Sequence, residues 1–293
     1  MQKCELCPRQ CKTNRQNGQL GFCGVPSELK IARAALHFWE EPVISGERGS
    51  GAIFFSGCSL RCVYCQNKRV SSEALGKSVS EAELEKIMLS LVSEGAHNIN
   101  LVTPSHYADT LARLLEKIKP SLGVPIVWNS SAYERKSTLE MLDGLVDIYL
   151  PDLKYLSPEL SEKYSSAPDY FEIAIEAIKE MKRQVGDIKL DENGMLRRGL
   201  IVRHLTLPGC RKDSVAALEA LANELGTKGF YLSVMSQYTP EFAADCAYKN
   251  LRRRVTGFEY DSVCRRAEEL GFDGFFQDRA AASPDFTPEF FGE

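Results

Sequence analysis

Three cysteines in one short run have the types and the spacing to hold a metal cluster. Cys58, Cys62 and Cys65 form the pattern C-x3-C-x2-C, and the aromatic residue Tyr64 stands just before the last of them. Three thiolates can ligate three corners of a four-iron cluster, which leaves the fourth iron without a protein ligand. An open, electron-rich iron can bind a small molecule and cleave it reductively. The spacing therefore predicts an enzyme that makes a radical.

Two other uses of these cysteines fit the sequence less well. Disulfides are typical of secreted proteins, but the first residues of this chain are polar and lack the apolar core of a signal peptide. We therefore expect a reducing, cytoplasmic setting. Structural zinc usually takes four ligands, often as two C-x2-C pairs, and this run has no local fourth ligand. An iron–sulfur cluster is the better interpretation.

The pattern resembles the signature of the radical S-adenosylmethionine (radical SAM) superfamily, in which such a run, with an aromatic residue in the last gap, follows an apolar strand. Residues 4–11, 21–24 and 51–58 extend the likeness. They resemble the branch named after pyruvate formate-lyase activating enzymes, in particular its PflX-like members. The resemblance covers nearly the whole chain, and it implies a class of chemistry rather than a substrate.

The resemblance implies that Cys58, Cys62 and Cys65 ligate a [4Fe-4S] cluster and act in catalysis, while the free iron takes the amino and carboxylate groups of SAM. One electron would then cleave SAM into methionine and a 5′-deoxyadenosyl radical, which abstracts a hydrogen atom from the substrate. The expected partners are SAM, a small electron-donor protein of the flavodoxin or ferredoxin type, and a substrate that could itself be a protein.

Four further cysteines near the start of the chain form a second candidate metal site. Cys4, Cys7, Cys11 and Cys23 supply enough thiolates for a closed tetrahedral site or for a cluster. The spacing leaves zinc, iron and an auxiliary iron–sulfur cluster all open, and we favour a structural role. The isolated cysteines at positions 210, 246 and 264 are most simply small buried apolar side chains.

The composition is that of an ordinary globular protein. Of its 293 residues, 44% are hydrophobic and 26% are charged, and no apolar run approaches the roughly 20 residues that cross a bilayer. The formal net charge of −4 argues against a broad phosphate-binding surface. We therefore expect neither a membrane nor a nucleic acid as a partner. The length suits one main α/β domain.

From about residue 50 onward, short apolar runs alternate with segments of helical period, which predicts βα units around a parallel sheet. The predicted strands are 52–56, 98–102, 125–129, 146–150, 200–205 and 230–235. The predicted helices are 80–94, 106–119, 137–142, 170–185, 213–225 and 256–271. Capping-box patterns at Ser80 and Ser137 mark two of the helix starts.

The expected fold is an α/β partial (β/α)6 barrel of the TIM type, because six strands rather than eight fit the barrel for which radical SAM proteins are known. Residues 1–50 lack the alternation and are expected to form a Cys-rich metal-binding cap. Residues 51–280 would form the barrel, and 281–293 a C-terminal tail. Active sites in such sheets lie at the carboxyl ends of the strands, where the cysteine run also falls.

Polar residues at or just beyond the predicted strand ends are the candidates for binding SAM. Thr103 and Ser105 occupy the place where relatives often carry a Gly-Gly-Glu run, and Ser105 could equally cap a helix. Asp152 and Lys154 resemble an Asp-x-Lys run with which activating enzymes contact SAM. The remaining candidates are Tyr64, which could pack near the adenine or simply in the core, and Asn129, Arg203 and Gln237.

Arginine is the natural partner of the SAM carboxylate, because its guanidinium binds carboxylates through two parallel hydrogen bonds. Side chains alternate along a strand, so only one of Arg203 and His204 can face inward. We expect His37 and His97 to be structural, because a lone histidine is more often satisfied within the fold than catalytic.

Two radical functions and one non-catalytic function are compatible with these residues. The first is activation of a glycyl radical enzyme, although the ferredoxin-like insert that many activating enzymes carry after the motif is missing here. The second directs the same radical chemistry to another protein, a peptide or a small molecule. The third is an iron–sulfur electron carrier or a metal-stabilised scaffold, which would need no SAM pocket.

Overall fold

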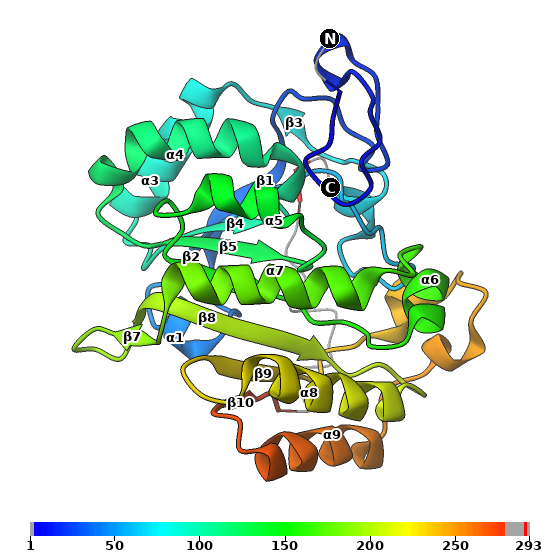
Figure 1. The fold of residues 1–293 in the computed structure, drawn as a ribbon. Helices are drawn as coiled ribbons and strands as arrows, with labels where there is room; N and C mark the ends of the chain where they lie inside the picture. Colours follow the sequence, from blue (N-terminus) through cyan, green and yellow to red (C-terminus); the bar gives the residue numbers. More distant parts are fainter. Residues whose placement is uncertain (1–2, 279–289, 292–293) are drawn as a thin grey trace.

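The computed structural model describes residues 3–278 and 290–291, and these form one open, curved sheet with helices packed against it (Figure 1). The strand order is β10-β9-β8-β6-β5-β4-β2-β1-β3, and the short β7 (Lys189–Leu190) pairs with β8. Because β10 and β3 are the two ends of this path, the sheet is a partial barrel that does not close.

Six parallel strands form the centre of the sheet. They are β2 (Ser50–Phe55), β4 (Ile99–Val102), β5 (Ile126–Ser130), β6 (Ile148–Pro151), β8 (Leu196–Leu205) and β9 (Tyr231–Met235). Each of them overlaps a strand predicted from the sequence, so the predicted α/β class with a parallel sheet is confirmed. The parallel strand β10 (Gly274–Phe276) beside β9 was not predicted.

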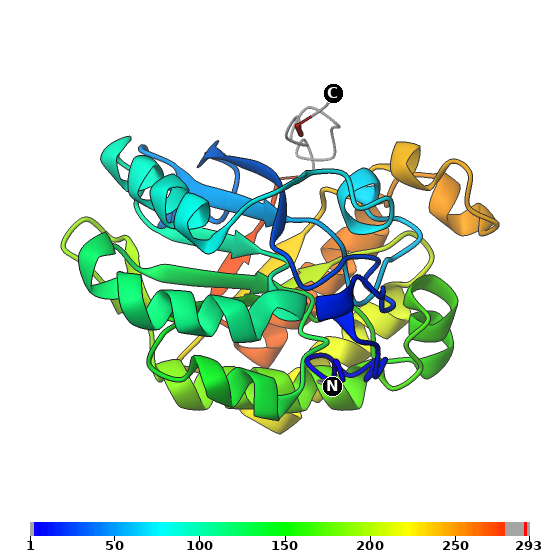
Figure 2. The ribbon, with the colours of Figure 1, turned by 90° about the horizontal axis from the view of Figure 1, so that it is seen from above.

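Helices follow most of these strands and lie along the outer side of the sheet (Figure 2). They are α3 (Glu81–Ser93), α4 (Ala108–Leu122), α5 (Lys136–Leu139), α6 (Pro158–Ser165), α7 (Tyr170–Val185), α8 (Arg211–Leu225) and α9 (Gly257–Leu270). Alternate strand residues such as Leu101, Trp128 and Tyr149 face this helical layer and form the main core with it. Among the described residues, no helix is both long and apolar enough to cross a membrane.

The two predicted capping boxes had different outcomes. Ser80 caps α3, because its hydroxyl accepts from the Glu83 N–H while the Glu83 carboxylate accepts from the Ser80 N–H. The box predicted at Ser137 is wrong, since α5 begins one residue earlier and Arg135 precedes it without a side-chain cap. The neighbouring Thr138 instead donates its hydroxyl to the Leu6 carbonyl at 2.7 Å, a long-range contact that the local pattern does not contain.

The sheet also includes residues from the first fifty. Strand β1 (Lys30–His37) pairs antiparallel with β2, and its other edge pairs with β3 (Lys77–Ser78). The boundary predicted between residues 50 and 51 therefore falls within β2, whose partner β1 comes from the predicted cap. Of the described residues before β2, 3–29 and 38–49 lie outside the sheet. Most of the predicted C-terminal tail, 281–293, lies outside the described residues.

The segment between β1 and β2 closes the amino ends of the parallel strands. Because β1 runs against β2, its last residue His37 pairs with Ser50 at the start of β2, and the chain then turns across the end of the barrel. Ile44 of α1 (Pro42–Ser45) packs there against Val127, Ile148 and Ile201. Glu40 and Glu41 precede this plug, so they approach the barrel interior from the end opposite to the cysteine run.

The Cys-rich segment is fastened to the loop that carries the cysteine run. Arg9 donates to the Ser59 and Ser165 carbonyls, both at 2.9 Å, and its guanidinium stacks on Phe22. Arg15 is buried and donates to the His106 carbonyl at 2.5 Å. The start of the chain therefore supports the cysteine loop from outside the barrel (Figure 1).

Candidate active site

The loop that leaves the carboxyl end of β2 carries the C-x3-C-x2-C cysteines. Gly57 starts this loop with a φ of +87°, and a Cβ at this position would come within 2.6 Å of the Cys23 carbonyl oxygen. Only glycine satisfies both conditions. Arg61 then holds the loop by donating to the Ser72 carbonyl at 2.7 Å. The loop conformation is thus fixed by contacts on the side away from the barrel.

The three thiols of this loop lie close to one another, with Cys62 buried and Cys58 and Cys65 partly buried. Burial raises the pKa of Cys58, and the neighbouring Cys62 thiol adds to the rise. Burial and Cys62 likewise raise the pKa of Cys65 to about 12. Three thiolates gathered without a compensating cation are therefore unfavourable, and an iron–sulfur cluster supplies that cation. The donor set, three soft sulfur ligands on one wall, fits such a cluster.

The cysteine loop forms one wall of a cavity of about 880 Å³ inside the partial barrel. The structure brings most of the predicted SAM-binding residues to this cavity. Its lining includes Cys58, Cys62, Cys65, Tyr64, Thr103, Asn129, Asp152, Lys154, Arg203 and Gln237. Pockets for a drug-sized ligand measure roughly 300–1,000 Å³, so this one has room for a nucleoside-sized molecule and part of a second.

Ser105 is the predicted residue that the structure places away from the cavity wall. It lies in the short helical turn Ser105–Tyr107, is buried, and hydrogen-bonds to the carboxyl group of Glu134. It does not cap α4, which begins at Ala108 after Tyr107. Its hydroxyl therefore serves a buried polar network behind β5.

A network of charged side chains crosses the cavity floor with Arg203 at its centre. The Arg203 Nε donates to Asp152 Oδ1 at 2.8 Å, Nη1 lies 3.1 Å from Glu40 Oε2, and Nη2 donates to Asn129 Oδ1 at 2.6 Å. Lys154 Nζ donates to Asp152 Oδ2 at 2.8 Å. Every nitrogen of the guanidinium is therefore committed to a partner inside the protein.

The network sets the charge of its members. Although burial opposes ionisation, Arg203 and Lys154 hold the pKa of Asp152 below its usual value. Asp152 is accordingly a carboxylate, and the pKa of Lys154 is raised despite burial because Asp152 lies beside it. For Glu40, burial outweighs the attraction of Arg203, and its pKa is raised. The network is thus an ion cluster with limited access to water.

Glu40 and Glu41 are cavity residues that the sequence analysis missed. Glu40 Oε1 accepts from Asn100 Nδ2 at 3.0 Å and from Asn129 Nδ2 at 3.2 Å, and both glutamates line the cavity. We had assigned them to the N-terminal cap because residues 30–37 were not recognised as a strand. The sequence sign of these residues is the pair of glutamates between Trp39 and Pro42, shortly after residues 30–37.

Strand alternation places Arg203 and His204 on opposite sides of β8, as expected. His204 is buried outside the cavity, where its Nδ1–H donates to the Leu153 carbonyl at 2.8 Å and burial lowers its pKa to about 4. His97 lies near the surface beside Arg48. His37, which we expected to be structural, lines the cavity, and burial lowers its pKa to about 4, so its imidazole is neutral.

Thr103 has an unusual backbone conformation at the end of β4. Its φ is +57°, in the left-handed region that β-branched residues avoid. The conformation is held by the Thr103 N–H, which donates to the Asn129 carbonyl at 2.8 Å. Such strain costs about 1–3 kcal/mol and is concentrated at ligand-binding sites. Both the strained backbone of Thr103 and its position in the cavity lining therefore make it a candidate ligand-binding residue.

Tyr64 packs in the core and also lines the cavity. Its ring packs edge-on against Tyr155, Tyr164 and Tyr238, and its hydroxyl lies 2.6 Å from that of Tyr155. It is therefore a core aromatic. It also lines the cavity beside the cysteine loop, so part of the ring can contact a ligand there.

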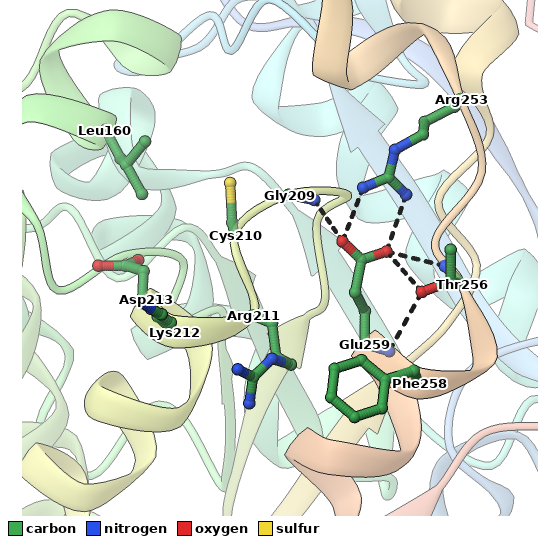
Figure 3. A pocket seen from close by; sticks show the side chains of 10 residues that line it. All are labelled: Leu160, Gly209, Cys210, Arg211, Lys212, Asp213, Arg253, Thr256, Phe258 and Glu259. Atoms are coloured by element: carbon green, nitrogen blue, oxygen red, sulfur yellow. Dashed lines mark hydrogen bonds and ion pairs between the residues drawn. The ribbon is translucent and has the colours of Figure 1, made fainter.

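A second cavity, of about 540 Å³, lies between the amino ends of α8 and α9 (Figure 3). Figure 3 shows the Glu259 carboxylate enclosed by Arg253, Gly209 and Thr256, with hydrogen bonds of 2.7–2.9 Å. These partners satisfy the charge of Glu259. Burial raises the pKa of the nearby Cys210 thiol to about 11, which makes it a poor nucleophile at neutral pH.

Comparison with known proteins shows which family the part of the chain that carries the site resembles. Residues 52–192, which run from β2 to the turn after β7 and include all three cysteines of the loop, match the Radical SAM superfamily. This part of the chain is therefore similar to radical SAM domains. A protein of Methanocaldococcus jannaschii, described as uncharacterized, is 29% identical over 282 residues, which cover 92% of this chain and 75% of that protein.

Several solved structures are similar in part. SuiB of Streptococcus suis bound to SAM shares 13% identity with a TM-score of 0.49, over 78% of this chain and 50% of SuiB. A domain of the pyruvate-formate lyase-activating enzyme from Bacteroides vulgatus shares 12% identity with a TM-score of 0.43, over 59% of this chain and 92% of that domain. The chain spans about half the length of the SuiB chains that it matches.

Proposed function

We propose that this chain is a radical SAM enzyme that cleaves SAM reductively in the large cavity. The observation that carries the proposal is the shared wall: the three loop cysteines face the same space as Asp152, Lys154 and Thr103. When bound, a [4Fe-4S] cluster would supply the electron and an open iron that SAM can chelate. The superfamily match of residues 52–192 supports the same class of chemistry.

The residues of the cavity would orient SAM in complementary ways. The Lys154 ammonium suits a carboxylate, while Asp152 and Asn129 offer oxygen atoms to ammonium or hydroxyl groups. Each nitrogen of the Arg203 guanidinium already has a protein acceptor, so Arg203 acts as a positioning residue that fixes Asp152 and Asn129. Polar groups held in place before the ligand arrives lose little orientation on binding, which favours SAM affinity and a single reacting geometry.

The direct test is SAM cleavage by the reconstituted protein. Under anaerobic conditions the chain is loaded with iron and sulfide, reduced with dithionite and incubated with SAM, and the products are measured by liquid chromatography and mass spectrometry. We expect 5′-deoxyadenosine and methionine in equal amounts. A reduced cluster that yields neither product would favour the alternative function, a non-catalytic electron carrier or metal-stabilised scaffold.

The finer expectations remain predictions. They are membership of the PflX-like branch, a cytoplasmic location, a flavodoxin or ferredoxin as electron donor, and a glycyl radical enzyme as substrate. For the last, the measurement is electron paramagnetic resonance of a co-purifying protein after incubation with the loaded chain and SAM. A stable backbone radical on that protein would support activation of a glycyl radical enzyme.

We further propose that the N-terminal cysteines hold a structural metal. Burial raises the pKa of Cys7 to about 11, and the thiols of Cys23, Cys11 and Cys4 add to the rise, which indicates that all four lie near one another. Cys11 Sγ also accepts a hydrogen bond from the Phe22 N–H at 3.2 Å, as sulfur ligands often do. Among the described residues, no three His, Cys, Asp or Glu side chains already surround one ion position, either in this segment or in the loop of Cys58, Cys62 and Cys65.

Metal analysis separates this proposal from the cluster. A variant with Cys58, Cys62 and Cys65 all changed to alanine is expected to retain about one tightly bound metal ion per chain. Changing Cys4 and Cys23 to alanine in the same background should remove that metal and lower the solubility of the protein. A metal-free triple variant that stays soluble would contradict the structural site.

A further inference from the structure

Glu41 is a buried carboxyl group in the large cavity that makes no direct ion pair within the described part of the chain, although Arg203 lies near enough to act on its charge. It is 8% exposed and lines the cavity, and its Oε2 has no hydrogen-bond partner within the described part of the chain. Its side chain hydrogen-bonds to Ser233, a neutral group. Buried acceptors are nearly always paired, so an unpaired one that faces a cavity points to a ligand donor.

The nearby cations are already engaged by other carboxylates. Arg203 pairs with Glu40 at 3.1 Å and with Asp152 at 2.8 Å, and Lys154 pairs with Asp152 at 2.8 Å. The cavity lining thus holds four carboxyl groups, those of Glu40, Glu41, Asp152 and Asp278, and the cations Arg203 and Lys154. Within the described part of the chain, Glu41 makes no direct ion pair with either cation. Burial raises the pKa of Glu41, while nearby Arg203 lowers it. A positively charged ligand group would stabilise the ionised form of Glu41, whereas an anionic group would add to the repulsion from Glu40.

Glu41 and the cysteine loop reach the cavity from opposite ends of the barrel. Glu41 reaches the cavity from the plug at the amino ends of the parallel strands, whereas Cys58, Cys62 and Cys65 follow the carboxyl end of β2. SAM chelated at the cysteine loop would occupy the carboxyl-end side of the cavity. The opposite side, beside Glu41 and Ser233, is then the space left for a second molecule.

We propose that Glu41 is a specificity residue that receives a cationic hydrogen-bond donor of the substrate, an ammonium or guanidinium group. The inference rests on the proposed function, because it assigns SAM to the cysteine side of the cavity. The Glu41 Oε2 lone pairs accept from the cation, and Ser233 keeps the other carboxylate oxygen in place. The substrate class is thus an amine or a guanidine, free or carried on a peptide.

The test uses the SAM-loaded holoenzyme and two simple probes, n-butylamine and n-butylguanidine, with n-butanol and butyrate as neutral and anionic controls. Binding is measured by ligand-observed NMR titration. We expect at least one cationic probe to bind the wild-type protein, with a dissociation constant that rises tenfold or more in Glu41→Gln. The Glu47→Gln variant, an exposed glutamate of the same segment, should bind like the wild type. Comparison of the two cationic probes distinguishes ammonium from guanidinium.

Three results would overturn the assignment. They are the absence of cation binding to the wild-type protein, equal probe affinity in Glu41→Gln and wild type, and a loss of SAM affinity in Glu41→Gln that matches the loss of probe affinity. The last would place the SAM ammonium at Glu41. Failure of the proposed function is distinguishable, because it would show as absent SAM cleavage by the wild-type protein whatever the probes do.

Discussion

Replacing Cys62 with alanine is expected to leave the protein folded but to lower its production of 5′-deoxyadenosine by more than about 100-fold. Changes outside the ligand shell of a metal site already cost about 10–100-fold, and this change removes a ligand itself. Cys62 is buried, and its Sγ accepts a hydrogen bond from the Ser165 hydroxyl at 3.0 Å, so the sulfur has a fixed position on the cavity wall. Iron and sulfide content and product formation after anaerobic reconstitution measure the effect.

The matched control is Cys264→Ala, which removes a partly buried thiol of α9 outside the cysteine loop. This variant should bind iron and cleave SAM like the wild type. Comparable circular dichroism spectra for both variants would separate loss of ligation from loss of fold. A Cys62→Ala protein with full iron content and product yield would show that the loop does not ligate the cluster.

The local features of this chain could be predicted from its sequence because they depend on neighbours in the chain. The cysteine run, the six parallel strands and the alternation that separates Arg203 from His204 all belong to this kind. The capping box at Ser80 is also local, since both of its hydrogen bonds span three residues. Features that depend on residues a few positions apart can be predicted from the local sequence.

The floor of the cavity could not be predicted, because its contacts join distant parts of the chain. Arg203 lies 163 positions from Glu40, 74 from Asn129 and 51 from Asp152. Glu40 reaches the cavity only because β1 runs antiparallel to β2 and delivers the following residues to the amino end of the barrel. The pairing of β1 with β2 depends on tertiary structure. Without it, the sequence predicts that Glu40 and Glu41 are surface residues of a cap.

The failure of the capping box predicted at Ser137 has the same origin. The pattern is locally correct, but the Thr138 hydroxyl donates to the Leu6 carbonyl, and α5 starts at Lys136 instead. A capping preference is worth only about 1 kcal/mol, so the local pattern alone does not fix where α5 begins. Sequence reasoning was reliable for elements and motifs, and weaker wherever the Cys-rich segment touches the barrel.

Replacing Arg203 with methionine is expected to destabilise the folded protein by about 3–5 kcal/mol, because it leaves buried carboxylates without their main cation. Arg203 is the shared partner of Glu40, at 3.1 Å, and Asp152, at 2.8 Å, with side chains that are 9–19% exposed. Methionine keeps the length and the apolar stem of the side chain, so lost packing contributes little. Urea unfolding gives the change in free energy, and the melting temperature should fall on the order of 10 °C.

Two controls test whether the buried charges cause this loss. Arg113→Met removes a pair in which Arg113 and Glu81 stand 3.8 Å apart with side chains 61% and 50% exposed, and it should cost no more than about 1 kcal/mol. Combining Arg203→Met with Glu40→Gln should cost less than the sum of the single changes, because the double variant no longer buries an unpaired Glu40 carboxylate. A loss below about 1 kcal/mol for Arg203→Met, or strict additivity in the double variant, would mean that water reaches the cavity floor and that Arg203 does not organise the site.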